Sequence, residues 1–110
     1  MSKMMPDLEG YFRDLVPKSD ALLLGLEEEA DRESIPIVGP VVGELLFVLA
    51  RATGATRILE LGTATGYSGI FLGRACAEIG GRVVSLEFDE AMAARARANP
   101  ASPRSHESTA

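Results

Sequence analysis

The sequence predicts an α/β fold in which two parallel strands are joined by a helix. Two short runs of aliphatic residues, at 57–61 and 82–86, are typical of strands buried on both faces of a sheet. Between them, residues 67–79 have helical length and are followed by Gly80 and Gly81, which are typical of a helix end. Because a strand, a helix and a strand follow one another, the strands are expected to be parallel, with a right-handed crossover.

Three helices are predicted before the first strand. The first ends at Pro17 and has one apolar face, made of Leu8, Tyr11, Phe12 and Leu15. The second spans about 20–32, and Ser19 is expected to be its N-cap. The third opens with Pro40 and spans about 40–53. It is expected to pack through an apolar face made of Val41, Val42, Leu45, Leu46 and Leu49.

A chain of 110 residues allows one small domain, in which three regions differ in composition. Residues 1–56 are expected to form the N-terminal helices. Residues 57–99 are expected to form a strand–helix–strand–helix unit, whose last helix is capped by Asp89. Residues 100–110 contain no Val, Ile, Leu, Met or aromatic side chain, so they cannot bury enough apolar surface to offset the entropy lost on ordering. This last segment is expected to be a disordered tail.

The charge and the cysteine count exclude several classes of partner. With 16 acidic and 11 basic residues, the net charge of −5 argues against nucleic acid, whose binding needs a basic face. The acidic run Glu27-Glu28-Glu29 is expected to lie on a solvated helix face. The single cysteine, Cys76, cannot form an internal disulfide and is expected to be a packed side chain of a cytoplasmic protein. No apolar run approaches the roughly 18 residues that cross a bilayer, so no membrane partner is expected.

The candidate binding site is the turn that follows the first strand, Glu60-Leu-Gly62-Thr-Ala-Thr-Gly66-Tyr-Ser68. A ligand at such a turn meets free backbone amides and the positive end of a helix dipole, and glycine allows close approach. Glu87 closes the second strand 21 residues after Gly66, near the spacing of about 20 at which an acid reaches a nucleoside ribose. Ala64 and Tyr67 replace the second and third glycines of the dinucleotide motif G-x-G-x-x-G, which argues against NAD and FAD.

Two plainer interpretations of these residues stay open. The glycines could serve only the turn itself. Glu60, near the end of a buried strand, could cap a helix or pair with an arginine.

The sequence resembles class I S-adenosylmethionine-dependent methyltransferases in three segments, which are residues 40–46, 58–68 and 83–87. Within that class they are similar to the metal-dependent O-methyltransferases of the catechol and caffeoyl-CoA type, in which the glycine turn is followed by Tyr-Ser. The resemblance extends from about residue 11 to 99. It implies the N-terminal part of a doubly wound, Rossmann-like methyltransferase fold, with an incomplete sheet.

The resemblance also implies roles for individual residues. Glu87 would accept hydrogen bonds from the two ribose hydroxyls, and Glu60 and Ser68 would lie near the ammonium and carboxylate of the methionine part. Val38 would contact the cofactor from above. The full set of expected cofactor-binding residues is Val38, Glu60, Gly62, Thr63, Gly66, Tyr67, Ser68 and Glu87. No catalytic residue and no metal ligand is identified.

By this resemblance the function is methyl transfer from S-adenosylmethionine to a small hydroxylated acceptor, with a divalent metal such as Mg²⁺ and, in full-length members, a homodimer. The chain leaves the family pattern at Pro100, so it is expected to be truncated before the metal and catalytic residues. Two alternatives stay open. One is a non-catalytic S-adenosylmethionine-binding fragment, and the other is a fragment of a nucleotide-binding oxidoreductase.

Overall fold

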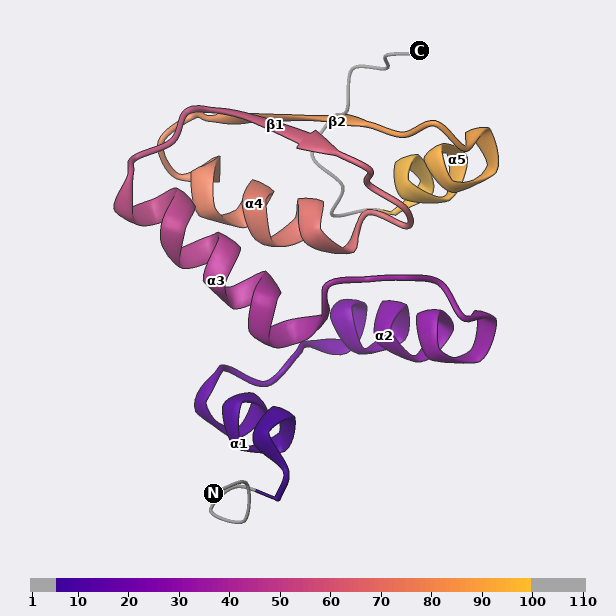
Figure 1. Cartoon of the computed structure of the whole chain (residues 1–110). Helices are drawn as coiled ribbons and strands as arrows, with labels where there is room; N and C mark the ends of the chain where they lie inside the picture. Colours follow the sequence, from indigo (N-terminus) through magenta and orange to yellow (C-terminus); the bar gives the residue numbers. More distant parts are fainter. Residues whose placement is uncertain (1–5, 100–110) are drawn as a thin grey trace.

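The computed structural model describes residues 6–99, and the tail expected at 100–110 lies outside them. The described chain contains five helices and two strands; three helices come first, and strands and helices then alternate (Figure 1). In chain order they are α1 (Leu8–Leu15), α2 (Ala21–Glu33), α3 (Gly39–Ala52), β1 (Arg57–Leu61), α4 (Tyr67–Ala77), β2 (Arg82–Leu86) and α5 (Glu90–Ala98). No helix among residues 6–99 is long and apolar enough to cross a membrane.

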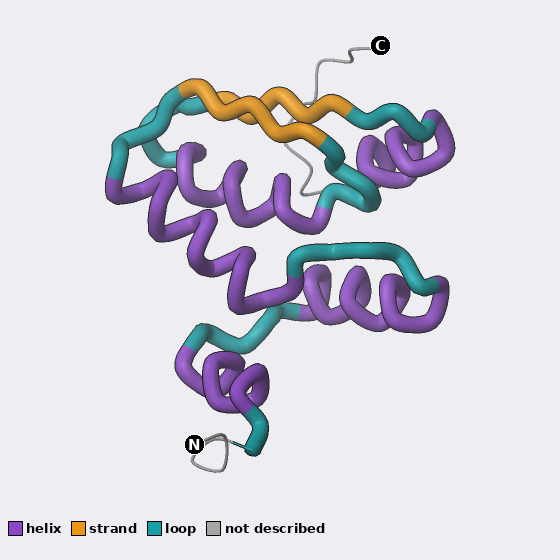
Figure 2. The backbone as a smooth tube through the Cα atoms, viewed as in Figure 1, coloured by secondary structure: helices purple, strands orange, loops and turns teal. Residues whose placement is uncertain are grey.

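The two strands form a parallel sheet, which confirms the α/β prediction. Arg57 pairs with Arg82 at one end of the register and Leu61 with Leu86 at the other. Helix α4 covers one face of the sheet, and α3 packs on α4 (Figure 2). On the opposite face the side chains of Leu59 and Leu61 are exposed.

The prediction that β1 is buried on both faces is therefore wrong for this structure. Side chains alternate along a strand, so Ile58 and Glu60 point towards α4 while Leu59 and Leu61 point away from it. Nothing in residues 6–99 covers the second face, and its aliphatic side chains are left exposed.

The core lies between the sheet, α4 and α3. One buried cluster joins α3, α4 and β2 through Ala50, Leu72, Ala75, Cys76 and Val83. Cys76 is thus a packed side chain, as expected. A second cluster joins α2 to the start of α4 through Leu23, Tyr67, Ile70 and Phe71.

The predicted packing face of α3 is largely wrong. Its buried residues are Gly43 and Ala50, whereas Val42, Leu45 and Leu49 are exposed. The ring of Phe71 lies so close to Gly43 that a Cβ at that position would stand 2.5 Å from it. The helix therefore packs through its small residues, which admit an aromatic ring, and only Leu46 of the predicted face packs against the core.

Two local predictions about α2 are also corrected. Its N-cap is Asp20, whose carboxylate accepts a hydrogen bond from the Leu23 amide at 3.0 Å, and not Ser19. Ser19 instead donates its hydroxyl to Glu27 at 2.6 Å. Glu27 and Glu29 of the acidic run contact other elements, so only part of that run is a solvated face. Asp89 caps α5 as predicted, by accepting hydrogen bonds from two amides of its first turn.

Candidate functional site

The candidate site is the turn from the end of β1 to the start of α4. Gly62 and Gly66 have φ angles of +82° and +90°, a region that side-chain-bearing residues rarely adopt. The Gly62 amide donates to the carbonyl of Leu86 at 2.7 Å, which fixes the turn to the end of β2. No side chain caps the first turn of α4. Its first amides have no partner within the helix, so the turn can bind an acceptor group at the positive end of the helix dipole.

Glu87 lies beside this turn, as its spacing predicted. One of its carboxylate oxygens accepts a hydrogen bond from the Ala64 amide at 2.7 Å, and the other accepts from the Asp89 amide at 3.0 Å. Ala64 itself has a φ of +46°, and its amide holds the carboxylate against the turn. A carboxylate offers about four lone-pair sites. With two of them used by backbone amides, Glu87 can still accept two hydroxyl groups.

Glu60 and Ser68 are in direct contact. The Glu60 side chain lies on the α4 side of β1 and is buried, and one of its oxygens accepts the Ser68 hydroxyl. Its other oxygen accepts the Ser85 hydroxyl at 2.9 Å. These two serines are its hydrogen-bond partners among residues 6–99, so the alternative of an arginine partner is not observed there. The carboxylate is held at the base of the turn by two neutral donors.

The sequence interpretation missed Ser85. Glu60 and Ser85 are paired residues in the parallel register and therefore share a face of the sheet. The aligned ends of the two predicted strands carry that information. Aligning Arg57 with Arg82 would have placed Ser85 next to Glu60.

The side chain of Tyr67 points away from the turn. It is 1% exposed, and its hydroxyl donates to a Glu27 oxygen at 2.8 Å. The Ser19 hydroxyl donates to the same oxygen at 2.6 Å. Burial and the neighbouring Glu27 carboxylate raise the pKa of Tyr67 well above the ordinary tyrosine range. Its phenol is thus committed to α2, and only its backbone amide remains at the turn.

The remaining expected residues surround the turn less closely. Thr63 is buried, and Gly66 packs against Ala96 of α5, with 3.5 Å between an added Cβ and the Ala96 Cβ. Val38 is exposed and precedes α3. Its neighbour Ile37 packs against the Tyr67 cluster, so this connector passes near the start of α4.

The polar groups at the turn fit an organic ligand and not a metal ion. Within residues 6–99 no three His, Cys, Asp or Glu side chains are grouped so as to hold a metal ion. The turn offers acceptors at Glu60 and Glu87 and donors at the start of α4. This arrangement fits a ligand that carries hydroxyl, ammonium and carboxylate groups.

The chain is similar to known O-methyltransferases. No family model matches it. A catechol O-methyltransferase of Niastella koreensis is 35% identical over 100 residues, which are 89% of this chain and 45% of that protein. The structure of an O-methyltransferase from Bacillus cereus with S-adenosylhomocysteine superposes with a TM-score of 0.80 and 33% identity. The match covers 99% of this chain and 52% of that one.

A second solved O-methyltransferase structure is also similar to this chain. The O-methyltransferase TomG from Streptomyces achromogenes, in complex with S-adenosylmethionine, superposes with a TM-score of 0.73 and 36% identity over 84% of this chain and 42% of that one. Over most of its length the chain is thus similar to O-methyltransferases whose structures contain S-adenosylmethionine or S-adenosylhomocysteine. It spans about half the length of the curated relatives it matches. The two parallel strands and their helices correspond to the N-terminal portion of this Rossmann-like methyltransferase fold.

Proposed function

We propose that this chain belongs to the S-adenosylmethionine-dependent O-methyltransferase family, binds S-adenosylmethionine at the glycine turn and serves methyl transfer to a small hydroxylated acceptor. The proposal rests on Glu87, which is held against the turn by the Ala64 amide and keeps room to accept two hydroxyl groups. Residues 57–99 are the proposed cofactor-binding unit. Relatives with S-adenosylmethionine or S-adenosylhomocysteine in their structures support the choice of ligand.

The residues of the turn divide the binding between them. Glu87 accepts the two ribose hydroxyls, and Glu60, buried beside two serines, accepts the ammonium group. The Ser68 hydroxyl is already donated to Glu60, so the amides at the start of α4 bind the methionine carboxylate. Glycine at 62 and 66 lets the ligand approach the backbone.

The other expected residues complete the proposed site. Thr63 lies within the turn, Tyr67 contributes through its amide, and Val38 approaches from the connector before α3. When bound, the cofactor would supply an electrophilic methyl group: an acceptor oxygen would bond to that carbon in line as its bond to sulfur breaks, so that S-adenosylhomocysteine leaves as a thioether and the acceptor hydroxyl loses its proton.

Several features of the proposed activity come from the resemblance alone. They are a divalent metal such as Mg²⁺, a homodimer and a cytoplasmic location. Residues 6–99 contain no ligand set for the metal, so their proposed part is cofactor binding.

Calorimetric titration with S-adenosylmethionine, S-adenosylhomocysteine and NADH tests the proposal. We expect binding of the first two and none of NADH. Glu87→Gln replaces an acceptor of charge-assisted hydrogen bonds, each worth about 1.5–3 kcal/mol, so affinity should fall at least about tenfold. Glu78→Gln is the matched control, because it removes the same charge at the far end of α4. Binding of NADH alone, or equal affinities for Glu87→Gln and the wild type, would contradict the proposal.

A methyl-transfer assay on a catechol with Mg²⁺ separates an enzyme from the second candidate, a non-catalytic S-adenosylmethionine-binding protein. That candidate is favoured by the lack of a metal ligand set in residues 6–99. Turnover would refute it.

A further inference from the structure

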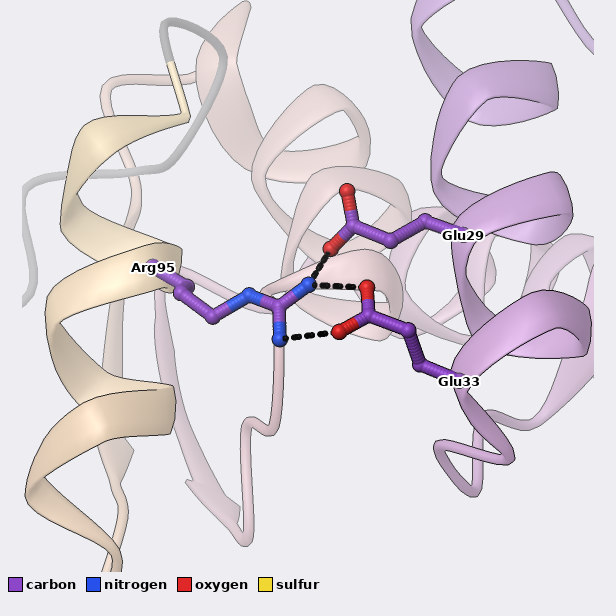
Figure 3. A network of polar contacts seen from close by, with 3 residues as sticks. All are labelled: Glu29, Glu33 and Arg95. Atoms are coloured by element: carbon purple, nitrogen blue, oxygen red, sulfur yellow. Dashed lines mark hydrogen bonds and ion pairs between the residues drawn. The ribbon is translucent and has the colours of Figure 1, made fainter.

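Arg95 of α5 joins the last described helix to α2. Its guanidinium group donates to both oxygens of Glu33, at 3.3 Å and 2.8 Å, and to one oxygen of Glu29 (Figure 3). Glu29 and Glu33 are four residues apart and therefore lie on one face of α2. The planar guanidinium contacts both carboxylates at once, a geometry that a lysine cannot reproduce. We call these three side chains the Arg95 cluster.

The Arg95 cluster is less exposed than the ion pair of Arg51 and Glu78. The side chains of Arg95 and Glu29 are 35% and 29% exposed, whereas those of Arg51 and Glu78 are 40% and 73% exposed. The carboxylates hold the pKa of Arg95 above its ordinary value, and Arg95 holds the pKa of Glu33 below its own.

Helix α5 contacts the proposed cofactor turn at two places. Ala96, next to Arg95, is buried against Gly66. At the other end of the helix, the amide of its N-cap Asp89 donates to Glu87 at 3.0 Å. A shift of α5 would therefore disturb both Gly66 and Glu87.

Helix α2 contacts the same turn from its other side. Glu27 accepts the hydroxyl of Tyr67, the first residue of α4, at 2.8 Å. Helix α2 is thus linked to α4 through Glu27 and to α5 through the Arg95 cluster, and both of these helices contact Gly66.

We propose that Arg95, Glu29 and Glu33 are positioning residues that hold α5 and α2 across the glycine turn, and that they set the affinity for the cofactor without touching it. This inference rests on the proposed function. The cluster acts by keeping the Asp89 amide on Glu87 and Ala96 on Gly66, so that the acceptors for the ligand stay in place. Because its charges are partly exposed, salt should weaken its effect.

The test is a calorimetric titration of the full chain with S-adenosylhomocysteine at about 0.05 M and about 0.5 M salt, where the Debye length falls from over 10 Å to a few Å. Arg95→Gln should raise the Kd about threefold to tenfold at low salt, and the difference from the wild type should shrink at high salt. Arg95→Lys keeps the positive charge but lacks the planar guanidinium group, so its affinity should lie between those of Arg95→Gln and the wild type. Arg51→Gln is the matched control, because it breaks the 2.8 Å ion pair with Glu78 away from the turn, and it should bind like the wild type.

Each outcome bears on one of the two proposals. If the wild type binds and Arg95→Gln binds equally well at low salt, the positioning role is refuted. The same follows if Arg95→Gln and Arg51→Gln weaken binding equally. If Arg95→Gln loses its helical circular dichroism, the titration is made with Glu29→Gln, which keeps the Glu33 pair and should weaken binding by a smaller factor; an unchanged Kd then refutes the role. If the wild type binds no S-adenosylhomocysteine at either salt, the proposed function fails and this inference with it.

Discussion

The backbone at Gly62 offers a sharp test of how the turn is built. An added Cβ at Gly62 would have no heavy atom within 4 Å, and the same is true at Gly25 in the middle of α2. The two glycines differ in backbone conformation, because Gly62 has a φ of +82° and Gly25 is helical. Alanine in the left-handed region costs about 1–2 kcal/mol. Alanine in place of a helical glycine gains about 0.5–1 kcal/mol.

Gly62→Ala should therefore destabilise the protein by about 1–2 kcal/mol, whereas Gly25→Ala should stabilise it by about 0.5–1 kcal/mol. For a domain of this size, 1 kcal/mol shifts Tm by about 4–8 °C. Urea unfolding and thermal melts followed by far-ultraviolet circular dichroism measure both variants against the wild type. The reasoning is wrong if Gly62→Ala is as stable as the wild type, or if the two variants shift in the same direction.

Two further predictions concern the contacts of α4. Tyr67→Phe removes the hydrogen bond to Glu27 and should cost about 1 kcal/mol. Since the pKa of Tyr67 is raised in the folded state, its stabilisation is complete below about pH 10 and is lost as the pH rises further. Urea midpoints of Tyr67→Phe and the wild type should converge above that pH, and a constant difference would disprove this. Gly43→Ala forces a Cβ to within 2.5 Å of the Phe71 ring and should destabilise by about 1 kcal/mol or more, despite its helical gain. Adding Phe71→Leu should recover part of that loss in a double-mutant cycle.

The order and type of the elements could be predicted because they depend on local patterns. The two aliphatic runs, the paired glycines after α4 and the capping Asp89 each act within a few residues. The packing face of α3 could not be predicted in the same way. Leucine spacing identifies an apolar surface, but it does not show that the Phe71 ring would pack against Gly43 instead. The sequence also predicts the N-cap of α2 one residue too early, since it does not show that the Ser19 hydroxyl donates to Glu27 and leaves the capping role to Asp20.

In the candidate site, too, local features could be predicted and contacts between distant residues could not. The glycine turn and Glu87 could be located because strand ends and sequence spacing place them at one edge of the sheet, whereas Glu60 and Ser68 became individual candidates through the family resemblance. The hydrogen bond of Tyr67 spans 40 residues and the ion pairs of Arg95 span 62 and 66. No periodicity connects residues so far apart in the sequence, so these contacts were visible only in the fold.

The acidic helix α2 changes how the charge of the chain is interpreted. Its carboxylates are not simply a solvated surface, because Glu27 holds Tyr67 and Glu29 and Glu33 hold Arg95. These contacts join α2 to α4 and α5, the two helices that contact Gly66. Backbone amides hold Glu87 in place, and serine hydroxyls hold Glu60. An acceptor that is already fixed loses little conformational entropy when a ligand binds. On the proposed function, we therefore expect the acidic residues of α2 to favour cofactor binding by keeping the turn in place, without attracting the ligand directly through their negative charge.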